Sequence, residues 1–278
     1  MPDPDESDRL HPDQVRRIQL RVLDQFLELC ARHDLSYFAY YGTLIGCARH
    51  GGFIPWDDDI DLAMPRRDYQ RLLTLDLEPL GLRLVSRHSA AGFPFGYAKL
   101  CDTSTLVIER LEPRYTGWGG VNLDIWPLDG LPRTALGRHA NDLLVRALRL
   151  IILAKILPPR PGRSRGRAAL LRVTRALSRP LSVPAALSLI DRLIVRPDGE
   201  LVGSRLGGRG REQWFPASWY TPVARLQFEG RQLRAPGRYH RILRGLYGDY
   251  LELPPESQRR SQHTFEAFVL RDSSPDES

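Results

Sequence analysis

Four aspartates stand within five positions, at residues 57, 58, 59 and 61, and this cluster limits how the segment can fold. In an extended strand, successive side chains point to opposite faces. Asp57, Asp59 and Asp61 are therefore predicted to share one face, with the apolar Ile60 and Leu62 on the other. Carboxylates crowded on one face repel each other unless a cation lies among them. The pattern predicts a divalent metal site. An acidic surface turn is the alternative, which the apolar back of the strand disfavours.

The composition is that of a globular protein without a disulfide framework or zinc site. With 278 residues, 42% of them hydrophobic, the chain can form one large domain or two small ones. Its three cysteines, Cys30, Cys47 and Cys101, are odd in number and form no CxxC pair. The N-terminus is acidic, unlike a signal peptide, and no run approaches the roughly 18 apolar residues of a spanning helix. These features predict a cytoplasmic protein.

The positive charge is concentrated in the middle of the chain. The net charge is +7, but residues 131–180 hold twelve Lys or Arg against one acid, Asp142, a local balance of +11. Such a block indicates an anionic partner, either membrane lipid, a polyphosphate glycan or nucleic acid. Residues 143–157 are typical of a basic amphipathic helix. This helix either lies on an anionic membrane surface or buries its apolar face and exposes its basic face to water.

Apolar periodicity and turn residues predict the order of elements along the chain. Residues 1–11 are expected to be disordered, and residues 271–278 to form a polar tail. A helix is predicted over 12–32, a strand over 35–40, a short helix over 43–49, the acidic strand, and a helix from Pro65 to about residue 75. Further strands are predicted over 82–87, 95–101, 104–109 and 120–126. Residues 135–195 have helical patterns, interrupted by a loop over 158–167.

Several motifs occur in a characteristic order along the chain. They are Gly-Thr-Leu-Ile-Gly at 42–46, Arg-His at 49–50, Gly-Phe-Ile-Pro-Trp-Asp-Asp-Asp-Ile-Asp at 52–61, Met-Pro-Arg at 64–66, Asp-Tyr at 68–69, Lys-Leu-Cys-Asp at 99–102 with Thr105, Leu-Asp-Ile-Trp-Pro-Leu-Asp-Gly at 123–130, Phe-Glu-Gly at 228–230, Pro236, Tyr239, Tyr-Gly-Asp-Tyr at 247–250, Pro-Pro at 254–255, Arg260 and His263. Together they resemble the signature of the LicD family. These are phosphocholine and related phospho-alcohol transferases, with the fukutin-related enzymes as distant relatives. The resemblance covers about residues 15–135 and 212–265.

The resemblance implies an α/β (α+β) fold, a nucleotidyltransferase-like mixed β-sheet flanked by helices with a metal site at its edge. One domain is expected over 12–270, with a helical basic insertion over 135–210. The superfamily pattern is a Gly turn, a strand with Asp-x-Asp and a third carboxylate on a later strand. Gly42-Thr43, Asp59-Ile60-Asp61 and Asp124 fill these places.

The resemblance also implies an activity. The chain would move a phospho-alcohol, phosphocholine by default, from a CDP-activated donor to a hydroxyl of a cell-surface glycan, such as lipopolysaccharide or teichoic acid, or of its lipid-linked precursor. CMP would be released, at the inner face of the cytoplasmic membrane. The expected cofactor is Mg²⁺, with room for two ions and with Mn²⁺ as a substitute, because phosphoryl transfer builds negative charge that two metals can clamp.

The acidic residues are assigned distinct roles. Asp59 and Asp61 are expected to bind metal directly, and Asp57 either binds metal or supports the ligands. Asp124 is expected to bind the metal nearer the acceptor and to serve as general base; the alternative is a strand-end residue satisfied by backbone donors. Asp58 is expected to face away and to order the turn.

Donor-binding residues are predicted around these carboxylates. Gly42 and Thr43 would offer backbone N–H groups and a hydroxyl to the phosphates. Arg49 would bind phosphate with His50 nearby, although a salt bridge to an aspartate is equally open. Lys99 would neutralise the leaving phosphate, the alternative being a snorkelling edge-strand lysine. Arg260 and His263 share a helical face and are expected near the nucleotide, whereas Tyr247 and Tyr250 are expected to pack in the core. Candidates for an aromatic cage around choline are Trp56, Tyr97, Trp118, Trp126 and Trp219.

Three other activities fit parts of the pattern. A nucleotidyltransferase would release pyrophosphate, and a metal-dependent glycosyltransferase would use Asp-x-Asp to hold a sugar nucleotide. A nucleic-acid binder built on the Arg-rich block is the least favoured, because that block lacks interleaved stacking aromatics.

Overall fold

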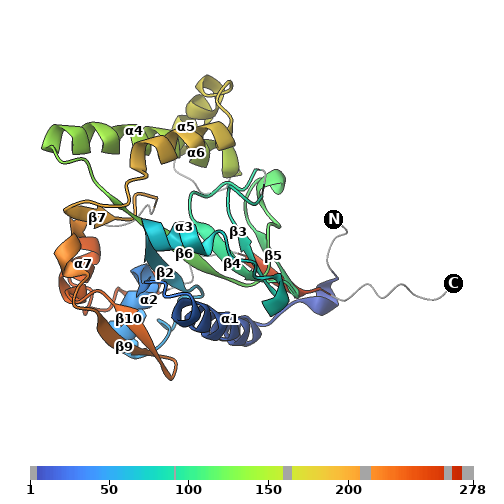
Figure 1. Ribbon diagram of the computed structural model, residues 1–278. Helices are drawn as coiled ribbons and strands as arrows, with labels where there is room; N and C mark the ends of the chain where they lie inside the picture. Colours follow the sequence, from blue (N-terminus) through green and yellow to red (C-terminus); the bar gives the residue numbers. More distant parts are fainter. Residues whose placement is uncertain (1–4, 91, 159–164, 207–213, 260–264, 271–278) are drawn as a thin grey trace.

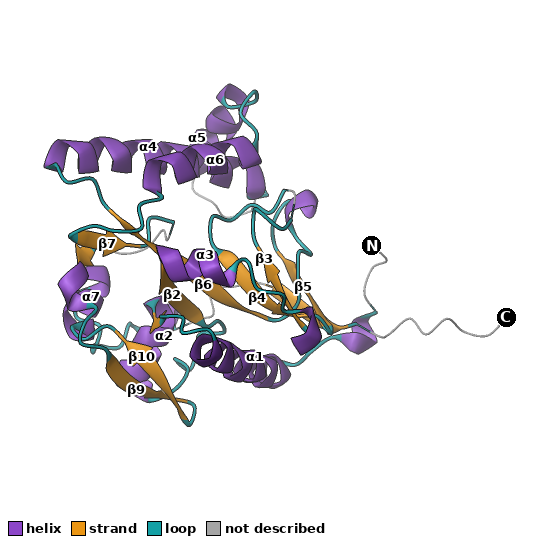
Figure 2. Cartoon of the chain, in the orientation of Figure 1, coloured by secondary structure: helices purple, strands orange, loops and turns teal. Residues whose placement is uncertain are grey.

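The computed structural model describes residues 5–90, 92–158, 165–206, 214–259 and 265–270 (Figure 1). A mixed β-sheet lies in the middle of the molecule, with helices outside it (Figure 2). Its strands run in the order β1 (Phe38–Ala39), β2 (Asp61–Pro65), β6 (Asn122–Gly130), β4 (Ala98–Asp102) and β3 (Leu82–Val85). β2 and β6 are parallel, and the other pairs along this order are antiparallel. The predicted α+β class with a mixed sheet is confirmed.

β2 and β6 form the centre of this sheet and position the acidic residues. Residues 62–64 are fully buried, as expected of a strand covered on both faces, which is apolar throughout. The strand begins only at Asp61, and residues 57–60 precede it outside the sheet. The prediction of one strand carrying all four aspartates is therefore wrong for the first three, and strand alternation does not set their directions.

Helix α1 (Pro12–Arg32) packs along β4 and β6, and its predicted range is confirmed. Val22, Phe26 and Leu29 recur at three- to four-residue spacing and are at most 3% exposed. Pro12 stands at the first helical position, where its missing N–H costs no hydrogen bond. The helix therefore forms one wall of the core on which the sheet rests.

The remaining elements surround this core. Helix α2 (Tyr41–Ile45) continues into the π-helical turn η2 (Gly46–His50), and α3 (Arg66–Leu72) packs on β2 and β6. Helix α7 (Tyr239–Tyr247) contacts α2, and the hairpin of β9 (Ala224–Phe228) and β10 (Arg231–Ala235) lies against β1. β5 (Thr105–Glu109) pairs with β11 (Phe265–Val269), while β7 (Leu201–Gly203) pairs with both β6 and β8 (Phe215–Pro216). The strand predicted over 35–40 is shorter than expected, and the helix from Pro65 ends at Leu72 instead of residue 75.

The prediction of disorder over residues 1–11 is wrong for residues 6–9, while residues 1–4 lie outside the described residues. Residues 6–8 form the short 3-10 turn η1 (Glu6–Asp8), and Arg9 bridges to Phe268 of β11. The Arg9 guanidinium also pairs with Glu266 at 3.1 Å. These contacts tie residues 6–9 to the edge of the β5–β11 pair.

The basic middle of the chain forms three helices, α4 (Ala135–Ile156), α5 (Arg165–Leu177) and α6 (Val183–Ile194). They gather at the top of Figure 1, and α4 packs against both other helices. Val145, Ile152 and Ile156 of α4 are buried against Leu187 and Ile190 of α6. The predicted helical character of 135–195 is confirmed, although α5 begins within the loop predicted over 158–167. Among the described helices, none is both long and apolar enough to cross a membrane.

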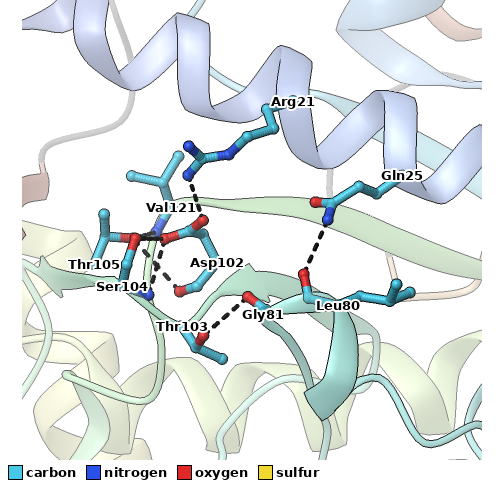
Figure 3. Close-up of polar contacts among 9 residues, drawn as sticks. All are labelled: Arg21, Gln25, Leu80, Gly81, Asp102, Thr103, Ser104, Thr105 and Val121. Carbon is cyan, nitrogen blue, oxygen red and sulfur yellow. Dashed lines mark hydrogen bonds and ion pairs between the residues drawn. The ribbon is translucent and has the colours of Figure 1, made fainter.

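Asp102 organises the tight connection between β4 and β5 beneath α1 (Figure 3). Its Oδ1 accepts from the Ser104 N–H and hydroxyl at 3.0 and 2.5 Å, and its Oδ2 accepts from Arg21 of α1 at 2.6 Å. The Thr105 hydroxyl donates to the same carboxylate and accepts from the Val121 N–H. The Asp102 and Thr105 positions of the family motif therefore hold the fold together.

Candidate active site

The acidic residues gather where β2 begins beside β6. Asp61 is the first residue of β2 and lies opposite Asp124 of β6 in the parallel register. In the segment before β2, Asp57, Asp58 and Asp59 each offer a carboxylate oxygen within 4.8 Å of the others. The prediction that Asp58 faces away is therefore wrong, because this segment is not a strand. We call these five residues the aspartate cluster.

Asp59 experiences the charges of the whole aspartate cluster. Burial raises its pKa well above the usual range, and Asp61, Asp57, Asp124 and Asp58 raise it further, in that order. Each of these effects opposes a negative charge on Asp59. A bound cation would offset the repulsion, and hard carboxylate oxygens are the donors that Mg²⁺ prefers. The residues present therefore fit a divalent metal, with ligands drawn from Asp57, Asp59, Asp61 and Asp124.

Asp61 is held in place on both its backbone and its side chain. Its N–H donates to the Thr43 hydroxyl at 2.8 Å, and its Oδ1 accepts from the indole N–H of Trp126 at 2.7 Å. At Gly42, a Cβ atom would clash with Oδ2 of Asp57. The Gly-Thr turn thus packs directly against the aspartates. Both residues lie in the first turn of α2, whose backbone N–H groups have no acceptor within the helix, and their contact with donor phosphates stays a prediction.

Asp124 is paired with Lys99 of the neighbouring strand. Its Oδ1 accepts from Lys99 Nζ at 3.0 Å and from Asn122 Nδ2 at 2.8 Å. The donors to this carboxylate are therefore side chains, and Asp124 lies within β6 instead of at its end. The alternative of a strand-end residue held by backbone donors is wrong. Lys99 also pairs with Glu109 at 3.3 Å. Burial alone would lower the pKa of Lys99, but Asp124 and Glu109 raise it well above the usual range.

Lys99 does not lie on an edge strand. β4 is hydrogen-bonded to β6 on one side and to β3 on the other, and the Lys99 side chain is only 12% exposed. The alternative of a snorkelling edge-strand lysine is therefore wrong. Its predicted contact with a leaving phosphate remains a prediction.

A cavity of about 410 Å³ opens beside the aspartate cluster. Asp58, Asp59 and Asp124 line one part of it. Its other lining residues include two aromatic rings and the Lys99–Glu109 pair, namely Phe95, Tyr97, Lys99 and Glu109. The Lys99 ammonium lies 5.5 Å from the centre of the Phe95 ring and 5.7 Å from that of Tyr97. The cavity thus places carboxylates, aromatic faces and one buried cation around the same space.

Two of the five aromatic cage candidates converge at this site. Tyr97 stacks on Trp126 with ring centres 3.9 Å apart, and Trp126 is the residue that binds Asp61. The other three lie against different partners: Trp56 lies beneath Arg259, Trp118 packs on Phe93, and Trp219 stacks on Phe215. Sequence spacing does not reveal this convergence, because β4 and β6 are distant in the chain.

Arg49 takes a position that the sequence did not suggest. Its guanidinium donates to the carbonyls of Tyr250 and Glu252 at 2.6 and 3.4 Å, and its Nε contacts His50 Nε2 at 2.9 Å. Burial and the charge of Arg259 lower the pKa of Arg49, and burial and Arg49 lower that of His50. The Arg49 side chain is thus held by backbone carbonyls that follow α7. This contact differs from the salt bridge between Arg49 and an aspartate that was the predicted alternative. The phosphate contact of both residues stays a prediction.

The C-terminal part adds one residue that sequence reasoning missed. Burial raises the pKa of Tyr247, and Asp61, Tyr41 and Asp57 raise it further. The charges of the aspartate cluster therefore act on Tyr247, although this residue is 38% exposed. The prediction of core packing is wrong for Tyr247 and confirmed for Tyr250, which is 3% exposed. The predicted Arg260 and His263 lie outside the described residues.

Comparison with known proteins gives a consistent result. Residues 34–142 match a family model described as "LicD/FKTN/FKRP, nucleotidyltransferase domain". The chain is 30% identical over 262 residues to the lipopolysaccharide cholinephosphotransferase LicD of Haemophilus influenzae, covering 90% of this chain and 95% of that protein. It is also 37% identical over 60 residues to an uncharacterized protein of Rickettsia typhi, covering 20% of this chain and 19% of that protein. The first alignment includes nearly the whole of both chains.

Proposed function

Because the chain belongs to the LicD family, we propose that it transfers phosphocholine from CDP-choline to a hydroxyl of lipopolysaccharide or a related envelope glycan, releasing CMP. The Haemophilus influenzae relative is a lipopolysaccharide cholinephosphotransferase, which supports both the phosphocholine and the lipopolysaccharide parts of this proposal. The assignment of phosphocholine as the transferred group and of the glycan as the acceptor is based on that similarity. The site chemistry rests on the residues of this chain.

The observation that carries the proposal is the aspartate cluster, in which Asp59 is surrounded by four other carboxylates. Such a set has little use without a cation, and Asp57, Asp59, Asp61 and Asp124 would hold one or two Mg²⁺ ions. When bound, the metal would neutralise charge on the diphosphate and on the oxygen leaving with CMP. The proposal of Mg²⁺ rests on this cluster of carboxylates.

The other side chains of the cavity would position the two substrates. Lys99 is a buried cation that can face the phosphates of the donor. Asp124 is placed to accept a proton from an acceptor hydroxyl that enters the 410 Å³ cavity. A quaternary ammonium binds well against aromatic faces, and Phe95 and Tyr97 with Glu109 provide such a surface. The cavity already accommodates one cation over these rings, the Lys99 ammonium.

The direct test is a reaction with purified protein, Mg²⁺, CDP-choline and lipopolysaccharide. We expect CMP in the nucleotide fraction and a phosphocholine mass increment on the glycan. Asp61→Asn should abolish both products, whereas Asp198→Asn, at an exposed ion pair with Arg67, should leave them unchanged.

A panel of other donors separates the competing activities. CDP-ribitol and CDP-glycerol test the identity of the alcohol, and nucleotide triphosphates and sugar nucleotides test the other reaction types. Release of pyrophosphate would assign the site to nucleotidyl transfer instead. Transfer of sugar without phosphorus would assign it to glycosyl transfer.

A further inference from the structure

Helix α5 turns an apolar face toward solvent. Leu170, Val173 and Leu177 are 51%, 56% and 79% exposed. Their spacing of three and seven residues places them on one stripe of the helix. Among the residues of α5 whose burial the structure describes, Leu171, on another side of the helix, is buried, and Ser178 is buried just after the helix ends. A helix of a globular protein normally buries its apolar stripe, so this exposed one requires an explanation.

Helix α4 repeats the arrangement. Leu136, Leu143 and Leu144 are 81%, 70% and 52% exposed, while Val145 and Ile152, on the side that packs on α6, are nearly fully buried. Helix α4 therefore has two apolar sides. One is buried against α6, and the other is exposed. The predicted alternative, a helix that buries an apolar face and exposes basic residues to water, is confirmed for the side that packs on α6, but Leu143 and Leu144 are exposed as well.

The exposed stripes of the two helices belong to one unit. Arg175 of α5 donates to the carbonyls of Ala154 and Leu157 at the end of α4, at 2.6 and 3.0 Å, which locks the two helices together. Figure 1 shows this unit at the end of the molecule away from the β9–β10 hairpin. We define the α4–α5 face as Leu136, Leu143, Leu144, Leu170, Val173 and Leu177.

Positive charge accompanies the α4–α5 face. Arg172 is exposed on a side of α5 away from the leucine stripe, Arg179 is exposed just after this helix ends, and Arg146 is exposed on α4. Residues 131–180 as a whole carry twelve basic residues against Asp142. An exposed apolar stripe on one side of a helix and arginines on its polar side are the pattern of a helix that lies in the interface of an anionic membrane.

We propose that the α4–α5 face docks on the surface of an anionic lipid bilayer, with its leucines among the acyl chains and its arginines at the headgroups. Charge complementarity favours this partner over a second copy of the chain, because two such faces would bring like charges together. The helices would lie in the plane of the interface and would not span it. This inference does not depend on the phosphocholine assignment.

Vesicle flotation tests the proposal. We expect the protein to float with vesicles of phosphatidylethanolamine and phosphatidylglycerol and to remain behind with phosphatidylcholine vesicles. Leu170→Ser/Leu177→Ser should weaken partitioning about tenfold or more, since two exposed leucines would no longer insert into the lipid. The matched control, Leu251→Ser/Leu253→Ser, changes two leucines that are 51% and 44% exposed elsewhere on the molecule and should partition as the unchanged protein does.

A charge variant and the oligomeric state complete the test. Arg172→Glu/Arg179→Glu should abolish binding to the anionic vesicles, and raised salt should weaken binding by the unchanged protein. Circular dichroism melting should show that each variant is folded. Equal flotation with neutral and anionic vesicles, or full flotation of the leucine variant, would overturn the proposal. So would a dimer in sedimentation velocity that the leucine variant dissociates, because the face would then join two copies of the chain.

Discussion

Asp61 and Asp124 lie directly opposite each other across the parallel strands β2 and β6. Register in a sheet moves in whole residues, and a shift of one residue would turn either side chain to the other face. Central strands buried on both sides cannot slip without exposing their apolar residues. The two residues are therefore fixed relative to each other by the core of the protein, which would give the proposed metal site its rigidity.

Asp59→Asn should stabilise the metal-free protein while abolishing transfer. The substitution removes a carboxylate whose charge is opposed by burial and by four neighbouring aspartates. We expect the free energy of unfolding without metal to rise by about 1 kcal/mol, measured by urea denaturation in the presence of EDTA. The stabilisation that Mg²⁺ gives the unchanged protein should be lost. An Asp59→Asn protein that is less stable without metal would contradict the repulsion argument.

Lys99→Met should make the protein more dependent on divalent metal. Without the ammonium, Asp124 and Glu109 face each other with no cation between them, at a cost of about 3 kcal/mol in the free energy of unfolding. Added Mg²⁺ should raise the melting temperature of this variant more than that of the unchanged protein. Lys99→Arg, which keeps the charge, is the control. If transfer by Lys99→Met were normal once Mg²⁺ is added, the predicted contact of Lys99 with the leaving phosphate would be ruled out.

Trp126→Phe should impair transfer more than it impairs stability. The phenyl ring can still stack on Tyr97, but the 2.7 Å hydrogen bond to Asp61 is lost. One such bond contributes about 1–2 kcal/mol, so we expect a small drop in melting temperature and a fall in kcat of about tenfold. Trp219→Phe, which changes a tryptophan that stacks on Phe215 away from the aspartates, should lose little activity. Equal effects of the two substitutions would show that Trp126 serves packing alone.

Arg66→Met should lower stability far more than Arg67→Met. Arg66 donates two hydrogen bonds to Asp129, at 2.7 and 2.5 Å, and both side chains are at most 6% exposed. Removing the guanidinium leaves a buried carboxylate without its partner, at a cost of about 3–5 kcal/mol. Arg67 pairs with Asp198 where both side chains are about 70% exposed, and such pairs contribute at most about 1 kcal/mol. Chemical denaturation of the two variants measures the difference directly.

The sequence by itself determined which residues are candidates for the site and which segments form the main elements. Local periodicity is enough to predict α1 and the strands of residues 82–126, because burial of one face imposes that spacing. The same holds for the helical nature of 135–195. The aspartates were identified because four carboxylates so close together repel each other, which predicts a cation among them.

The tertiary structure decided how these residues meet. Strand alternation placed Asp58 away from the site, but β2 begins only at Asp61, so Asp58 joins the aspartate cluster. The pairing of Lys99 with Asp124, and of Trp126 with Asp61, depends on the order of β2, β6 and β4 in the sheet. Periodicity also shows that α4 and α5 have apolar faces, but it cannot show which face the fold buries. Which face is buried depends on contacts between segments that are distant in the sequence, and local periodicity contains no information about such contacts.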